Sequence, residues 1–356
     1  MAHPLIDALP GFPVKISAVL PSLDKAWAEE GEDAARASQM NLVLMFGVGV
    51  SPADAQARFD EAIRFAQRYP CRLVVLAARP AAEAAAALEA KVNVVCFLDP
   101  SRRGKRCCEA LMLAHGAPTA ELESLVSTWL EGDLPTNVWA HGVTPAEFSP
   151  WLAWSARCRR VVADRSLVGD AFFALPFPEP KGVRDLAVAR CLPVRQALGQ
   201  FLAGHAPADL VRGLRTVTVA HGAGLAGEAT GLLAWMKGCL THCAGLSRAH
   251  LDATFALSAQ APSGDNLAAE WTFADGARFS WEHADQGTRA IITFSRSRQP
   301  APVAQRVALM GAPEAVSEAV FFYKVVAVGG KRFAVRTSRL RSAAASPASA
   351  GSPGLR

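Results

Sequence analysis

Several features that would place this chain in a specialised class of protein are absent from its sequence. No window of eighteen residues is both apolar and uncharged, which excludes a transmembrane helix. The N-terminus has no basic segment followed by an apolar core, so we expect no secretory signal and a cytoplasmic protein. No internal repeat is present, which excludes a repeat architecture.

The sequence also lacks a strong excess of charge of either sign. Its 37 Lys and Arg residues stand against 32 Asp and Glu residues, a net charge of +5. The densest basic cluster, residues 102–106, is typical of a solvated loop. We therefore predict neither nucleic acid nor a membrane as a partner.

The eight cysteines lack the paired spacing of a zinc site. Cys239, His242 and Cys243 follow one another on a predicted helix, but no second pair of ligands lies nearby, so we predict no metal. In a long intracellular chain, cysteines are expected to be thiols. Cys71 and Cys158 lie at the ends of predicted elements and are the candidates for exposed, redox-active thiols.

What the sequence does contain is the pattern of an α/β fold. Apolar residues make up 51% of the chain and charged residues 19%, as in ordinary globular proteins. Two apolar runs, Met40–Gly47 and Arg72–Ala78, predict strands that are buried on both faces. Between them, Ser51 caps a predicted helix whose first residue is Pro52. The pattern predicts a βαβ unit.

The region around Glu131–His141 organises the rest of this α/β pattern. Apolar spacing predicts a helix over Thr119–Leu130, and Thr136–Ala140 reads as a short buried strand. Two further runs, Val92–Leu98 and Cys107–Leu113, are separated by a short basic loop, which favours an antiparallel hairpin. We therefore expect a mixed, mostly parallel sheet.

The sequence predicts two domains. Residues 1–175 form the α/β domain with the mixed sheet, a proline-rich linker covers 176–182, and an α+β domain covers 183–340. Within the second domain we expect helices at Val183–Leu202, Ala226–Leu240 and Pro313–Val325. Its antiparallel meander is expected at Ala253–Ser258, Asn266–Phe273, Arg278–His283 and Arg289–Arg296. Residues 341–356 are small and polar, which predicts a disordered tail.

No catalytic constellation is complete in the sequence. The loop Gly47–Ser51 follows a strand and opens a helix, as in a dinucleotide-binding fingerprint, but Pro52 replaces the third glycine. Pro52 also lacks the N–H that an oxyanion hole after a nucleophilic Ser51 would need. His115, His141 and His221 follow predicted strands without an assignable acidic partner. We predict no catalytic residues and no cofactor; a nucleotide- or sugar-phosphate-binding enzyme using Gly47–Ser51 stays open as the alternative.

An ordered set of short motifs resembles one known family, that of the OpcA proteins, which are glucose-6-phosphate dehydrogenase assembly proteins. The resemblance runs from about residue 40 to 245 and more thinly to about 340. The motifs are Asn41-Leu-Val43, Tyr69-Pro-Cys-Arg72, Asp133-Leu-Pro135 with Val138-Trp139, Arg160-Val-Val162 with Asp164, and Asp185-Leu-Ala-Val-Ala-Arg190.

This resemblance implies a non-enzymatic role. A member of the family would bind glucose-6-phosphate dehydrogenase, promote its active oligomer as an allosteric effector, and support the oxidative pentose phosphate pathway. The partner-binding residues would lie near Asp133, Pro135, Trp139 and Arg190. This chain departs from the family at Ala140 and Val188, where tryptophan is usual.

Overall fold

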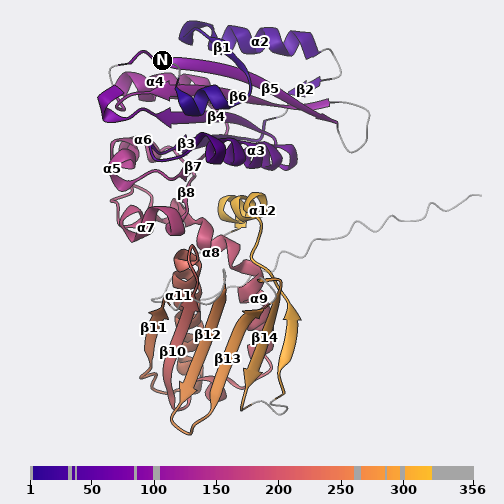
Figure 1. The fold of residues 1–356 in the computed structure, drawn as a ribbon, viewed down its shortest axis with the longest axis vertical. Helices are drawn as coiled ribbons and strands as arrows, with labels where there is room; N and C mark the ends of the chain where they lie inside the picture. Colours follow the sequence, from indigo (N-terminus) through magenta and orange to yellow (C-terminus); the bar gives the residue numbers. More distant parts are fainter. Residues whose placement is uncertain are drawn as a thin grey trace, which may run out of the picture. The chain divides into compact units, whose positions relative to one another are not determined.

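The structure is a computed structural model of the whole chain (Figure 1). It describes residues 3–30, 34–36, 38–83, 86–98, 105–259, 266–284, 287–296 and 301–322. Within these residues, no helix has the length and apolar character that crossing a membrane requires. Residues Met1–Val325 form one compact unit. The predicted tail at 341–356 and most of the basic loop lie outside the described residues.

The strands of the first sheet are β1 (Phe12–Val14), β2 (Ala34–Arg36), β3 (Met40–Phe46), β4 (Cys71–Ala78), β5 (Glu89–Leu98), β6 (Lys105–His115), β7 (Thr136–His141), β8 (Arg160–Ala163) and β9 (Val183–Asp185). In the described part of the chain, this sheet contains a path of six parallel strands, a short strand β2 that pairs in parallel with β6 beside this path, and an antiparallel edge made by β5 and β1. The parallel strands lie in the order β6-β4-β3-β7-β8-β9. This is the 3-2-1-4-5-6 order of doubly wound sheets.

Helices cover both faces of this sheet because its strands are apolar on both sides (Figure 1). Along β3, Leu42 and Leu44 face α1 (Pro4–Ala8), α3 (Pro52–Arg68) and α12 (Ala312–Ser317). Val43 and Met45 alternate to the other face, which belongs to the second hydrophobic cluster. The helices of that face are α2 (Val19–Glu30), α4 (Ala120–Trp129), α5 (Pro145–Phe148), α6 (Leu152–Ser155) and α7 (Arg165–Phe173).

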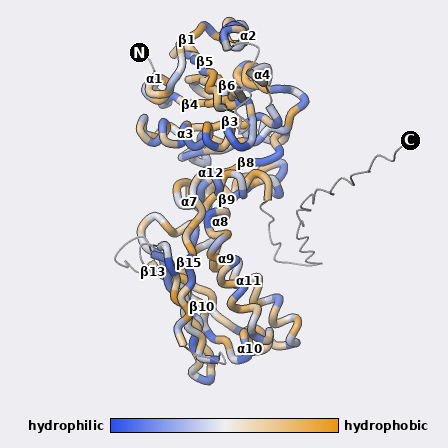
Figure 2. Tube along the Cα trace, turned by 90° about the vertical axis from the view of Figure 1, so that its right-hand side faces the viewer, coloured by the Kyte–Doolittle hydropathy of each residue, from blue (hydrophilic) through white to orange (hydrophobic). Residues whose placement is uncertain are grey.

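The second sheet has the order β11-β10-β12-β13-β14-β15. Helices α9 (Leu192–Leu202), α10 (Pro207–Val211) and α11 (Ala226–Ser247) cover one of its faces, as Figure 2 shows. Its core is built on Trp271, Trp281 and Phe279. The strands are β10 (Leu214–His221), β11 (Thr254–Ser258), β12 (Leu267–Phe273), β13 (Arg278–Ala284), β14 (Arg289–Phe294) and β15 (Val303–Arg306).

The predicted fold class is confirmed, with local differences. The antiparallel meander holds for β12–β14, but β11 pairs with β10 in parallel. Helix α11 explains this difference because it provides the long crossover that parallel neighbours require. The single helix predicted at Val183–Leu202 is instead β9, α8 (Leu186–Arg190) and α9.

Two segments of the predicted C-terminal domain lie against the first sheet. Strand β9 pairs with β8, and α12 packs against α3 and α8. Phe321 follows α12 and lies against Phe65 and Tyr69, with ring centroids 6.1 and 4.6 Å away. The domain boundaries themselves stay a prediction.

The hairpin of β5 and β6 is antiparallel, as predicted, but its cysteines are not all thiols. Cys96 lies directly opposite Cys107 in the register, and the two form a disulfide. The expectation of eight thiols is therefore wrong. Six of the cysteines are free, and four of those six are buried.

Candidate functional site

The carboxyl ends of β3, β4, β6 and β7 meet at one edge of the first sheet. In doubly wound sheets the connections leave the first strand in opposite directions, and ligands bind at this switch point. Here the switch point lies between β3 and β7, where the loops beginning at Gly47 and Gly142 follow the two strands. This edge is therefore the candidate ligand site of the first sheet.

The two glycine loops at the switch point pack directly on each other. A Cβ atom built on Gly47 would lie 2.0 Å from the carbonyl oxygen of Gly142, and Gly142 has a φ of +62°. The N–H of Gly47 donates to the carbonyl of His141 at 3.1 Å. Glycine at position 47 thus allows the backbones of the two loops to lie in close contact.

Replacing Gly47 by Ala is expected to destabilise the protein by about 1–3 kcal/mol, because backbone atoms of the facing loop must move. Urea unfolding checks this value. Gly49→Ala is the matched control, since a Cβ atom there meets nothing within 4 Å. Equal stability of the two variants would contradict the close contact.

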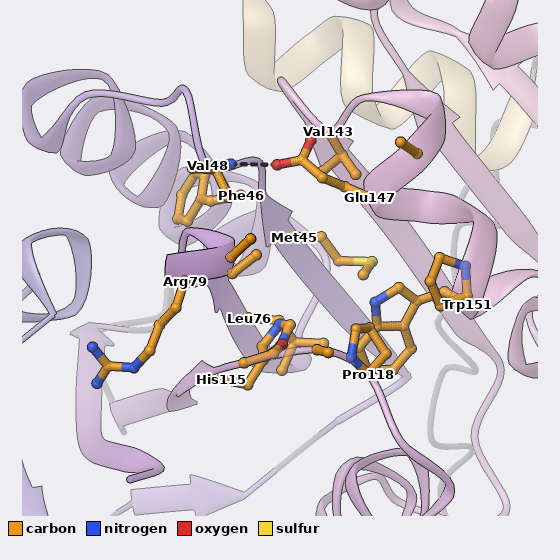
Figure 3. Close-up of a pocket in the computed structure, with 16 residues that line it drawn as sticks. Met45, Phe46, Val48, Leu76, Arg79, His115, Pro118, Val143, Glu147 and Trp151 are labelled. Carbon is orange, nitrogen blue, oxygen red and sulfur yellow. Dashed lines mark hydrogen bonds between the residues drawn. The ribbon is translucent and has the colours of Figure 1, made fainter. Parts of the chain in front are cut away.

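One N–H of the Gly47–Ser51 loop is already bonded to a carboxylate of the protein. The N–H of Val48 donates to Glu147 Oε1 at 2.7 Å, and the other carboxylate oxygen accepts from the N–H of Thr144 (Figure 3). Ser51 caps α3, and Asp54 in its first turn lies 2.6 Å from His141 Nε2. A carboxylate of the protein itself therefore takes the N–H of Val48, which a phosphate at this helix start would use.

A cavity of about 340 Å³ lies beside this loop. Met45, Leu76 and Trp151 are buried residues of its lining, and Val48 is an exposed one. Among the lining residues that Figure 3 labels, only Arg79, His115 and Glu147 carry ionisable side chains. The guanidinium of Arg79 is bonded to Glu89 and to the carbonyl of Ala87.

His115 is the polar side chain of this cavity that has a ring nitrogen without a hydrogen-bond partner among the described residues. Its Nδ1 lies 2.7 Å from the carbonyl of Gly116, which can only accept, so Nδ1 carries the proton. Its ring meets Trp151 edge to face, with centroids 5.8 Å apart. Burial lowers the pKa of His115, so the ring is neutral at pH 7 and Nε2 is an acceptor. No partner of Nε2 lies among the described residues.

The four residues predicted to bind a partner do not come together. Asp133 and Pro135 are exposed in the loop that precedes β7, at the amino edge of the parallel strands. Trp139 is buried, with 2% of its surface exposed, in the cluster that includes α3. Arg190 ends α8 and bonds Asp164, which follows β8, so it lies at the carboxyl edge.

Arg190 belongs to an ion network that the sequence did not reveal. Its guanidinium contacts Asp164 at 2.7 Å and Glu228 at 2.6 Å. Ser166 donates to the second oxygen of Glu228 at 2.7 Å. Burial opposes the charge of Arg190, but the two carboxylates outweigh it and raise its pKa. The network joins α7, α8 and α11, so it fixes the packing of these helices.

The expectation that Cys71 and Cys158 are exposed thiols is wrong. Both side chains are buried, because the ends of their elements face the core. The neighbouring Cys108 thiol and burial raise the pKa of Cys71 well above its usual value. Burial raises the pKa of Cys158 to about 12. A thiol with so high a pKa is rarely a thiolate and reacts slowly.

The histidines at strand ends differ in their surroundings. His141 has the acidic partner that the sequence could not assign, Asp54, whereas His221 contacts the carbonyl of Gly222. Among the described residues, no group of three His, Cys, Asp or Glu side chains could hold a metal ion.

Comparison with known protein families gives a match to part of the chain. Residues 62–175 match the family model described as the glucose-6-phosphate dehydrogenase subunit N-terminal domain. No curated protein matches the chain. The matched segment runs from α3 to the residues just after α7 and includes β7 and most of the cavity lining. This match covers less than half of the chain, and it supports the resemblance of residues 62–175 to the OpcA family of glucose-6-phosphate dehydrogenase assembly proteins.

Proposed function

We propose that this protein is a non-enzymatic assembly factor that binds glucose-6-phosphate dehydrogenase and favours its active oligomer. The family match over residues 62–175 is the observation that carries the proposal. Through this partner, the protein supports the oxidative pentose phosphate pathway.

The proposed mechanism is a shift of populations and needs no chemistry by the chain itself. A protein that binds the active oligomer better than the inactive form shifts the equilibrium by the ratio of the two affinities. A ratio of ten corresponds to about 1.4 kcal/mol. The effect should therefore saturate with the concentration of the assembly factor.

We propose the loop Glu131–Pro135 as one contact with the dehydrogenase. The side-chain amide of Asn41 donates to the carbonyl of Glu131 at 2.9 Å, and its oxygen accepts the N–H of Glu131. Arg72 also pairs with Glu131, at 2.6 Å. These bonds hold the loop while Asp133 and Pro135 stay exposed. A rigid exposed loop loses little entropy on binding.

Mixing the two proteins is expected to raise the fraction of the dehydrogenase oligomer or lower its KM for glucose 6-phosphate. Analytical ultracentrifugation and initial rates measure these two quantities. Asp133→Lys should weaken the effect at least several-fold through charge reversal at the contact. Asp252→Lys, at another exposed aspartate outside the matched segment, is the control. If neither quantity changes while both proteins are folded, the proposal fails.

The alternative is a nucleotide- or sugar-phosphate-binding enzyme. The doubly wound strand order favours it, since such sheets bind nucleotides at the switch point. The carboxylate of Glu147 on the N–H of Val48 argues against it. Equilibrium titration with NADP or glucose 6-phosphate separates the two candidates.

A further inference from the structure

We propose that the cavity beside the Gly47–Ser51 loop binds an uncharged aromatic molecule that donates one hydrogen bond to His115 Nε2. This site does not depend on the proposed assembly role, because no dehydrogenase takes part in it. The proposed site lies at the switch point of the first sheet and binds a ligand that carries no phosphate.

The place and size of the cavity agree with a ligand site. It opens at the carboxyl ends of β3, β4 and β6 and is bounded by the residues that follow β7. Ligands of doubly wound sheets bind in this position. Its volume of about 340 Å³ lies at the lower end of the range for small-molecule pockets, roughly 300–1,000 Å³. A bicyclic ring is therefore the expected size.

The lining selects an apolar and flat ligand. Met45, Leu76 and Val143 are buried apolar residues of the wall, and Trp151 adds an aromatic ring. Rings that meet edge to face or in offset stacks attract each other beyond what burial alone provides. Figure 3 shows Met45, His115 and Trp151 arranged around the same space.

The charges around the cavity exclude an anion. The Glu147 carboxylate already accepts the N–H groups of Val48 and Thr144, at the loop where a phosphate would otherwise bind. The cation of the lining, Arg79, pairs with Glu89 at 2.7 Å and with Glu83 at 3.7 Å. In Figure 3 its guanidinium points away from the other labelled residues. A phosphate or carboxylate would thus meet negative charge without a free positive partner.

His115 supplies the single directional contact. With Nδ1–H donated to Gly116, the neutral ring offers only the lone pair of Nε2. A ligand N–H or O–H satisfies this atom, whereas an aromatic ring without a donor leaves it unpaired. One such hydrogen bond favours the donor ligand by about three- to tenfold.

Indole and benzofuran are a matched pair of probes, because the two rings have nearly the same shape and only indole carries an N–H. Ligand-observed NMR and calorimetry with the full chain should show saturable binding of indole, about three- to tenfold tighter than that of benzofuran. NADP and glucose 6-phosphate should not displace indole. Absence of saturable binding, or displacement by either phosphate compound, would overturn the proposal.

Variants then locate the site. Ala146→Phe fills the cavity and should abolish indole binding, while Ala153→Phe, at an exposed alanine of α6 outside the lining, should retain it. His115→Phe should remove the preference for indole over benzofuran. Circular dichroism verifies folding of each variant. Indole binding that survives Ala146→Phe would place the ligand elsewhere and refute the assignment, even if His115→Phe fails to fold.

Discussion

Replacing Arg190 by Met is expected to lower the free energy of unfolding by about 3–5 kcal/mol. The guanidinium contacts Asp164 and Glu228, and Glu228 is almost fully buried, with 1% of its surface exposed. Without the cation, two neighbouring carboxylates remain in a region of low dielectric, and breaking a buried ion pair in this way costs about that much. Urea unfolding followed by fluorescence measures the loss.

Two further variants test the cause of the Arg190 effect. Arg215→Met, at an exposed arginine of β10, should change the free energy of unfolding by no more than about 0.5 kcal/mol. The double variant Arg190→Met with Glu228→Met should be more stable than Arg190→Met alone, because one uncompensated carboxylate is gone. If the double variant is less stable by the sum of the single effects, the two residues are not coupled.

His283 is expected to make the protein less stable in acid. Burial lowers the pKa of His283 from 6.5 to about 4 in the folded state. Between pH 6.5 and about pH 4, His283 is protonated in the unfolded chain but neutral in the folded chain. The free energy of unfolding therefore falls as the pH falls, and the loss is complete below about pH 4. A difference of 2.5 pH units corresponds to about 3 kcal/mol.

Urea unfolding at pH 7, 5.5 and 4 measures this dependence on His283. His283→Phe removes the titrating group at a buried position next to Trp281, whose ring lies 4.7 Å away. The variant should lose less stability than the wild type between pH 7 and pH 4. His250→Gln, at an exposed position, should follow the wild type. Burial also lowers the pKa of His3 and His115, so the comparison, and not the wild-type curve alone, isolates His283.

Local parts of the fold could be predicted because their signals lie in neighbouring residues. The apolar run at Met40–Gly47 became β3, buried on both faces, and Ser51 caps α3, as the sequence predicted. Thr136–Ala140 became β7, which lies next to β3 in the sheet. The spacing of apolar residues and the capping of helices depend on interactions over a few residues, so both can be recognised directly in a sequence.

Features that depend on strand pairing could not be predicted. The Cys96–Cys107 disulfide requires the hairpin register, and a slip of one residue would turn one of the cysteines to the other face. The strand order that creates the switch point is likewise absent from any local pattern.

The ion network of Arg190 also could not be predicted. The partners of Arg190 lie 26 and 38 residues away along the chain, so no local pattern connects them.

The candidate site illustrates the same limit of local patterns. The apolar pattern predicted a buried strand at Thr136–Ala140, and Trp139 is buried there, whereas its role in partner binding came from the family resemblance and stays a prediction. His115 could be placed at a strand end, but its neutral ring depends on burial in the folded chain, and its contact with Trp151 depends on a segment that follows β7.

The position of α12 has a consequence for synthesis of the chain. Ala315, Val316 and Val320 complete the hydrophobic layer over α3, although α3 lies far upstream of them in the sequence. Until these residues leave the ribosome, that layer stays open to water, so the α/β region that is made before them cannot reach its final packing. A shortened gene ending at the proline-rich segment would therefore yield a fragment that aggregates.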